Sequence, residues 1–201
     1  MKTVSKIVIF AMVWFIFSEK TLRAANPYGT GKTPIVSAPT ATVTAMQQWA
    51  KNKNATPVFV ELAQLFYDIA VSIGIDPVVA YTQSAKETGY GRFGGVVDST
   101  FFNPCGMKIS SGGENDNPEN YERFASWVEG IKAHCDHLAL YAGMNGYPKN
   151  ATPDPRHFPY IYGVAPNVED LGKRWADSEF YGNEITVLMD EVYNTVYKKI
   201  K

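Results

Sequence analysis

The feature that most constrains this chain is a helical repeat of apolar residues enclosed by a start signal and a stop signal. Thr56-Pro57 is typical of a helix start, and Gly74 is typical of a helix end. Between them the apolar side chains recur every three or four residues, which is the spacing of one helix face: Phe59, Leu62, Leu65, Phe66, Ile69, Ala70 and Ile73. Such a face is stable only when it packs against other elements, so the sequence predicts a helical core built around residues 57–73.

Similar signals predict further helices along the chain. Asp76-Pro77 is a second helix start, and this helix is expected to stop at Gly89, which puts Glu87 in its last turn. Ser126 and Glu129 form a capping box that starts another helix. The remaining predicted helices are a short one near Met46, the capping-box helix up to Tyr141, one from Asn167 to about Ala176 and one from Tyr181 to Ile200.

The segment between Gly89 and Phe124 has a different composition, with glycines, short apolar runs and turn residues. We expect residues 105–109 and 121–124 to pair as a small β-hairpin around a polar loop. A second long loop, 143–162, contains four prolines and must be held by tertiary contacts. The predicted fold class is α+β, mainly α-helical with a small β-hairpin.

The first residues of the chain have the pattern of an export signal. Lys2 and Lys6 are followed by an apolar run of eleven residues, 7–17, and then by a segment, 22–25, that ends on small residues. The run is shorter than the ~20 apolar residues that cross a bilayer. We therefore predict a signal peptide over residues 1–25, with an uncleaved anchor as the alternative.

Two regions follow the predicted signal peptide. Residues 26–44 are rich in Thr, Ala and Pro, which is typical of a linker. Residues 45–201 are expected to form one domain. No second long apolar segment follows the first, so we expect no stable membrane insertion of the mature protein and a secreted or cell-wall location.

Charge and composition exclude several function classes. The chain has 19 Lys+Arg and 20 Asp+Glu, a balance that argues against a nucleic-acid partner. Two cysteines, Cys105 and Cys135, are too few for a four-cysteine metal site. In an exported protein they either form a disulfide or remain buried thiols. The 12 Tyr, 11 Phe and 4 Trp suit a groove that stacks on ring-shaped ligands.

Glu87 is the first candidate for chemistry. A carboxyl group in the last turn of a helix lies near the negative end of the macrodipole, which disfavours its ionised form. Tyr90 and Phe93 are expected to desolvate it further. A carboxylic acid that stays protonated near neutral pH is what a glycosidase needs to protonate a leaving oxygen. The alternative is a solvated glutamate beside Lys86.

The segment AYTQSAKETGYG, residues 80–91, resembles the glucosaminidase family of peptidoglycan hydrolases, glycoside hydrolase family 73, and its phage-endolysin-like branch in particular. The family is also described as mannosyl-glycoprotein endo-β-N-acetylglucosaminidase. Further segments extend the resemblance over residues 42–200: GGVVD (94–98), NPCGMK (103–108), RFASW (123–127), AHCDHLALYAG (133–143), DPRHF (154–158) and WA (175–176).

The resemblance implies a lysozyme-like fold with Glu87 as the general acid. It also implies peptidoglycan glycan strands as the substrate, cleavage of the β-1,4 bond after N-acetylglucosamine, and no cofactor. The family often takes a second carboxylate from the hairpin region, where this chain offers Glu114, Asp116, Glu119 and Glu122. Of these Glu114 is preferred, and the alternative is that the N-acetyl group of the substrate acts as the nucleophile.

The family also has a tyrosine late in the domain, and here that position holds Trp175. Tyr181 and Tyr162 are the candidates for its role. The residues expected to bind substrate are Gln83, Tyr90, Asn103, Trp127, Arg156, His157, Tyr162 and Tyr181.

Several other functions remain open at this point. A muramidase or a lytic transglycosylase would use the same fold and acid on the alternate bond. His134 and His137 lie at i, i+3 with Asp136 between them and His157 later, a pattern that a zinc amidase would also use. We favour the view that these histidines satisfy nearby polar groups, and expect no metal. A non-catalytic cell-wall-binding module would keep the aromatic groove without needing Glu87.

Overall fold

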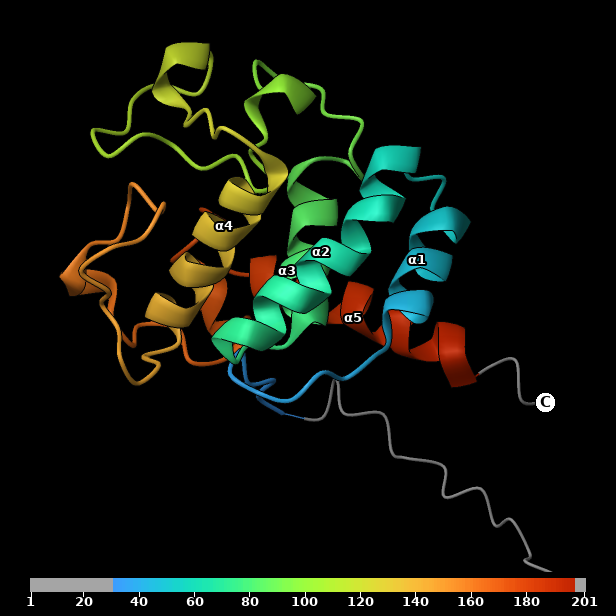
Figure 1. The fold of residues 1–201 in the computed structure, drawn as a ribbon. Helices are drawn as coiled ribbons and strands as arrows, with labels where there is room; N and C mark the ends of the chain where they lie inside the picture. Colours follow the sequence, from blue (N-terminus) through green and yellow to red (C-terminus); the bar gives the residue numbers. More distant parts are fainter. Residues whose placement is uncertain (1–30, 198–201) are drawn as a thin grey trace, which may run out of the picture.

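The structure is a computed structural model that describes residues 31–197. The predicted signal peptide, residues 1–25, lies outside the described residues. Figure 1 shows a helical bundle with long connecting segments at one end and along one side. The α-helices are α1 (Val43–Asn52), α2 (Pro57–Ile73), α3 (Pro77–Glu87), α4 (Trp127–Tyr141) and α5 (Tyr181–Tyr197).

The predicted start and stop signals of α2 and α3 are confirmed. The Thr56 side chain accepts a hydrogen bond from the Phe59 backbone N–H, and Pro57 occupies the first turn. Gly74 ends α2 with a left-handed φ of 104°. The Asp76 side chain caps α3 by accepting from the Val78 N–H, and α3 ends at Glu87. The sequence therefore placed Glu87 correctly at the carboxyl end of a helix.

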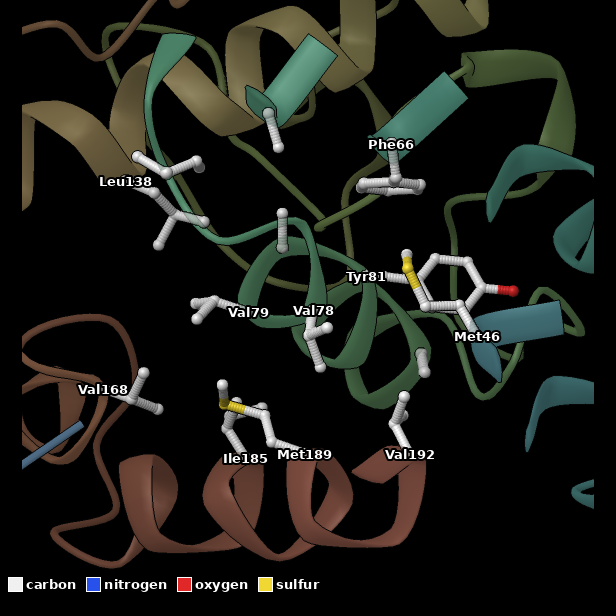
Figure 2. Packing of buried hydrophobic residues seen from close by; sticks show 14 of the residues in the cluster. Met46, Phe66, Val78, Val79, Tyr81, Leu138, Val168, Ile185, Met189 and Val192 are labelled. Carbon is white, nitrogen blue, oxygen red and sulfur yellow. The ribbon is translucent and has the colours of Figure 1, made fainter. Parts of the chain in front are cut away.

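Helix α3 is the centre of the core. Every residue from Pro77 to Ala85 is buried, so α3 has no solvent-facing side. Figure 2 shows Val78 and Val79 above Ile185 and Met189 of α5. Tyr81 is fully buried on the side of α2, where its ring stacks on Phe59 at 4.6 Å and its hydroxyl donates to the Phe59 carbonyl (2.9 Å). Elements packed on every side therefore fix the end of α3.

The predicted linker contains a segment that packs on the domain. Ile35 is fully buried. Its N–H donates to the Pro166 carbonyl (3.1 Å), and its carbonyl accepts from the Asp76 N–H (3.0 Å). The Thr33 carbonyl accepts from the Val168 N–H (2.8 Å). The expectation of a loose spacer is wrong for this part, because one apolar side chain and paired backbone groups bind it to the fold.

The predicted hairpin is reduced to a single bridge. Lys108 and Tyr121 form an isolated antiparallel bridge, and no β-strand occurs in residues 31–197. Two backbone hydrogen bonds cross between the expected strands, from the Glu122 N–H to the Met107 carbonyl (2.9 Å) and from the Ile109 N–H to the Asn120 carbonyl (3.1 Å). The pairing extends no further, because the left-handed Gly106 (φ 61°) and the 3₁₀ turn Pro118–Asn120 interrupt the extended backbone on either side of it. The described fold is therefore mainly α-helical.

The predicted helix from Asn167 to about Ala176 is wrong beyond its first turn. Only a 3₁₀ turn, Val168–Leu171, forms there. Gly172 then comes so close to the Glu179 carbonyl that a Cβ at this position would lie 2.4 Å from the oxygen. This tight packing turns the chain out of a helical path. Among the described helices, none is long and apolar enough to span a bilayer.

Candidate active site

An open cleft of about 530 Å³ lies at the carboxyl end of α3. Glu87 and Thr88 form one wall. The other walls come from the connecting segments before and after α4, which Figure 1 shows at the top of the bundle and along its side. The other residues that line the cleft are Phe93, Gly94, Gly95, Val96, Val97, Asn103, Gly106, Asn115, Tyr121, Trp175, Ala176 and Asp177.

Glu87 has the properties expected of a proton donor. Burial raises the pKa of its carboxyl group. The hydrogen bond from Tyr181, the charge of Lys86 and the indole of Trp175 oppose that rise and do not cancel it. Lys86 also pairs with Glu184 at 2.7 Å. A raised pKa keeps Glu87 protonated to higher pH than an ordinary glutamate.

A chain of buried side chains stands behind Glu87. The Tyr181 hydroxyl donates to Oε1 of Glu87, and Nε2 of Gln83 donates to the Tyr181 oxygen (3.0 Å). Oε1 of Gln83 is 2.9 Å from Nε2 of His134. Gln83 is fully buried and does not line the cleft, so the structure gives it a supporting position rather than the substrate contact expected from the sequence.

The hairpin acids lie differently from the sequence expectation. Glu114, Asp116 and Glu119 are exposed on the loop and do not line the cleft. Their neighbours Asn115 and Tyr121 do line it. The second acidic residue of the lining is Asp177, which sequence reasoning did not single out. Its signal was the acidic stretch that directly follows Trp175-Ala176.

Two of the predicted aromatic residues lie away from the cleft. Tyr90 packs on Trp49, with ring centroids 5.6 Å apart. Trp127 lines a separate apolar pocket on the side of α2, together with Phe59. Phe93, which was expected only to desolvate Glu87, lines both the cleft and this pocket.

Arg156, His157 and Tyr162 hold the long proline-containing loop in place. Nη1 of Arg156 donates to the Ile109 carbonyl (3.2 Å), which ties this loop to the segment before the hairpin turn. The Tyr162 hydroxyl donates to the Gly143 carbonyl (2.8 Å). None of the three lines the cleft. Of the predicted site residues, Glu87, Asn103, Tyr181 and Gln83 are thus the ones at the cleft: the first two line it, and the other two form hydrogen bonds behind Glu87.

The histidines are each engaged by other side chains. His134 binds Gln83, while Nδ1 of His137 and of His157 lie 2.8 and 3.0 Å from one carboxylate oxygen of Asp154. Within residues 31–197, no group of three or more His, Cys, Asp or Glu is arranged to hold a metal ion. This arrangement matches the view that the histidines satisfy nearby polar groups.

Cys105 and Cys135 are both buried free thiols. The structure therefore has the second of the two arrangements that the sequence left open. Burial raises the pKa of both thiols, so neither is an activated nucleophile.

Comparison with known proteins gives one family and two relatives. A family model described as glucosaminidase, mannosyl-glycoprotein endo-beta-N-acetylglucosaminidase, matches residues 63–194. An uncharacterized protein of Borreliella burgdorferi is 31% identical over 139 residues, which are 68% of this chain and 65% of that protein. This chain thus spans slightly less than two thirds of the length of that relative.

Among solved structures, the catalytic domain of the autolysin Auto from Listeria monocytogenes is similar to this chain. The identity is 17% and the TM-score 0.45, over 80% of this chain and 90% of that one. Neither relative bears on the phage-endolysin-like branch or on the lysozyme-like fold, which stay predictions.

Proposed function

Since the chain belongs to the glucosaminidase family of glycoside hydrolases, we propose that it cleaves peptidoglycan glycan strands at the β-1,4 bond after N-acetylglucosamine. The observation that carries this proposal is Glu87, whose carboxyl group lines an open cleft, accepts a hydrogen bond from the buried Tyr181 and has a raised pKa. A cleft of this size has room for a sugar ring and is walled in part by Phe93, Tyr121 and Trp175.

In the proposed mechanism Glu87 donates its proton to the bridging oxygen as the bond from that oxygen to the anomeric carbon breaks. The positive charge that develops on the ring is then quenched by a water molecule, which leaves the N-acetylglucosamine residue as a new reducing end. Glu87 recovers a proton in the course of this second step.

For the second catalytic group, Glu114 stays our proposal from the family pattern, and it competes with two others. Asp177 is favoured by its place in the cleft lining. The N-acetyl group of the substrate itself is the third candidate, because substrate-assisted glycosidases need no second carboxylate nucleophile.

We also propose that the protein acts outside the cytoplasmic membrane. The support is the apolar run of residues 7–17 after Lys2 and Lys6, together with a substrate that lies outside the cell. Expression of the full chain, followed by mass determination of the protein in the medium and in the cells, tests cleavage after residue 25.

The function is tested by incubating the protein and Glu87→Gln with purified peptidoglycan, with and without a chelator. The fragments are reduced with borohydride and identified by mass spectrometry. Glu61→Gln is the matched control, because Glu61 is an exposed glutamate on α2 outside the cleft. We expect reduced N-acetylglucosamine ends from the wild type and the control, and none from Glu87→Gln.

Other products would assign the alternatives. Reduced N-acetylmuramic ends would indicate a muramidase, and anhydro ends a lytic transglycosylase. Chelator-sensitive release of stem peptides would indicate an amidase. Binding without any fragments would indicate a wall-binding module, and full activity of Glu87→Gln would refute the proposed acid.

A further inference from the structure

The hydrogen-bond chain behind Glu87 has a defined direction. Its four members come from three helices: Glu87 and Gln83 from α3, Tyr181 from α5 and His134 from α4. Gln83 and His134 are fully buried, and Tyr181 is 3% exposed. Because water is excluded from these links, each donor and acceptor must be matched by another member of the chain.

The Gln83 amide sets the polarity of the chain. Its Nε2 can only donate, and it points at the Tyr181 oxygen (3.0 Å). Its Oε1 can only accept, and it faces Nε2 of His134 (2.9 Å). The Tyr181 hydroxyl proton is then free to be donated to Oε1 of Glu87. Every bond therefore runs from His134 toward Glu87, provided that Nε2 of His134 carries a proton.

The unpartnered nitrogen of His134 settles which tautomer is present. Burial lowers the pKa of His134 to about 3, so the ring is neutral and carries a single proton. Nδ1 is buried and has no hydrogen-bond partner among the described residues. A buried N–H without an acceptor costs more than a buried lone pair without a donor. The proton is thus on Nε2, where Gln83 accepts it.

We propose that His134 and Gln83 are positioning residues that aim the Tyr181 hydroxyl at Oε1 of Glu87 and thereby leave Oε2 to carry the proton given to the substrate. This inference deepens the proposed function and rests on it. A protonated carboxyl group has one oxygen that accepts and one that donates. A donor fixed on Oε1 therefore selects Oε2 as the acid.

Among the described residues, no other group near these four side chains can orient the Tyr181 hydroxyl in place of Gln83 and His134. The groups around Glu87 are the Lys86 ammonium, the Trp175 indole, the Cys105 thiol and the exposed Asp177 of the cleft. Lys86 is itself paired with Glu184. The groups around His134 are the rings of Phe66 (6.1 Å) and Trp175 (5.7 Å), with His137 and Asp154 acting through their charges. Of these, none is hydrogen-bonded to Gln83 or His134 in the part of the chain that the structure describes.

Loss of the His134 donor releases the Gln83 amide. The amide can then turn over and present Oε1 to the Tyr181 hydroxyl, which donates to Gln83 instead of Glu87. The ionised form of Glu87 loses a donor, so the pKa of Glu87 rises. Since the general acid must be protonated, activity falls as pH rises through that pKa. The high-pH limb of the curve of activity against pH therefore moves to higher pH.

The test compares pH profiles of peptidoglycan cleavage for His134→Leu, His134→Gln and Tyr181→Phe. Tyr181→Phe removes the donor outright and is expected to move the high-pH limb up by roughly one pH unit. His134→Leu should move it in the same direction by less, with a lower kcat and an unchanged KM. His134→Gln keeps a donor near the position of Nε2 and should restore the wild-type limb. Identical limbs for His134→Leu and His134→Gln would overturn the proposal.

A second measurement does not depend on activity. The ¹⁵N shifts of labelled histidine in the unmodified protein report which ring nitrogen is protonated. The chain holds three histidines, so the spectrum of His134→Gln identifies the His134 signals. A proton on Nε2 is expected, and a proton on Nδ1 would overturn the proposal. Because this result is independent of cleavage, it separates failure of this inference from failure of the proposed function.

Discussion

Asp136 is the residue whose charge should contribute most to stability. It lies on α4, its side chain is fully buried, and four side chains bind it. Lys132 (2.9 Å) and Thr152 (2.7 Å) donate to Oδ2, while Lys149 (2.7 Å) and Tyr147 (2.6 Å) donate to Oδ1. Three of these partners belong to the proline-containing loop, so the Asp136 carboxylate anchors that loop to the bundle.

The stability contribution follows from the pKa. Burial opposes ionisation of Asp136, but the bonds from the two lysines, Tyr147 and Thr152 outweigh it and lower the pKa to about 2 from 3.8. A shift of this size corresponds to about 2 kcal/mol of stability. The folded-state pKa is depressed, so this stability is present above the unfolded pKa and is lost as pH falls through about 2.

The assay is urea unfolding of Asp136→Asn and the wild type at pH 7 and at pH 2. At pH 7 we expect Asp136→Asn to be less stable by about 2 kcal/mol, and at pH 2 the difference should shrink by about half or more. Asp68→Asn is the matched control, because Asp68 is exposed on α2. A loss below about 0.5 kcal/mol at pH 7, which is within the usual range for surface substitutions, would refute this account of the cluster.

Three further predictions test the packing and the second carboxylate. Gly130→Ala should unfold the protein or cost at least about 3 kcal/mol by thermal melting, because its Cβ would lie 1.9 Å from a backbone carbonyl oxygen. Ile35→Ala should cost about 3 kcal/mol in urea unfolding, whereas Val36→Ala, which is 41% exposed in the wild type, should cost little. Of Asp177→Asn and Glu114→Gln, the variant that loses at least about tenfold in kcat on peptidoglycan identifies the second carboxylate, and full activity of both would favour the substrate's N-acetyl group.

The parts of the fold that the sequence predicts well are those fixed by neighbours along the chain. Thr56-Pro57, Gly74 and Asp76-Pro77 act on backbone groups within four residues, and their helices begin and end as predicted. Ile35 was missed because it is a lone apolar residue in a Thr/Pro-rich stretch, and its burial depends on Pro166 and Asp76. The hairpin was overestimated because the left-handed Gly106 and the 3₁₀ turn Pro118–Asn120 limit the pairing to the Lys108–Tyr121 bridge.

The same distinction applies to the site. The position of Glu87 at the end of a helix could be predicted because it is a local property of the sequence. The contacts of Tyr181 with Glu87 and Gln83 join residues 94 and 98 positions apart, which no spacing rule reveals. Gln83 was expected to bind substrate in the cleft, but its side chain is fully buried and faces His134 and Tyr181. Polar residues within an otherwise apolar helix were the available signal for such a buried network.

The buried polar side chains of Gln83, His134 and Tyr181 allow a last test, because burying polar groups costs free energy that their hydrogen bonds only offset. A buried hydrogen-bond network adds little net stability, since apolar side chains of similar shape can replace both partners at almost no cost. The free energy of unfolding of the triple variant Gln83→Leu, His134→Leu, Tyr181→Phe should therefore lie within about 1 kcal/mol of the wild-type value. Its kcat on peptidoglycan should nonetheless fall at least about tenfold, because no hydroxyl group then orients the Glu87 carboxyl group. A loss of stability above about 3 kcal/mol in urea unfolding would mean that the network maintains the fold rather than the acid.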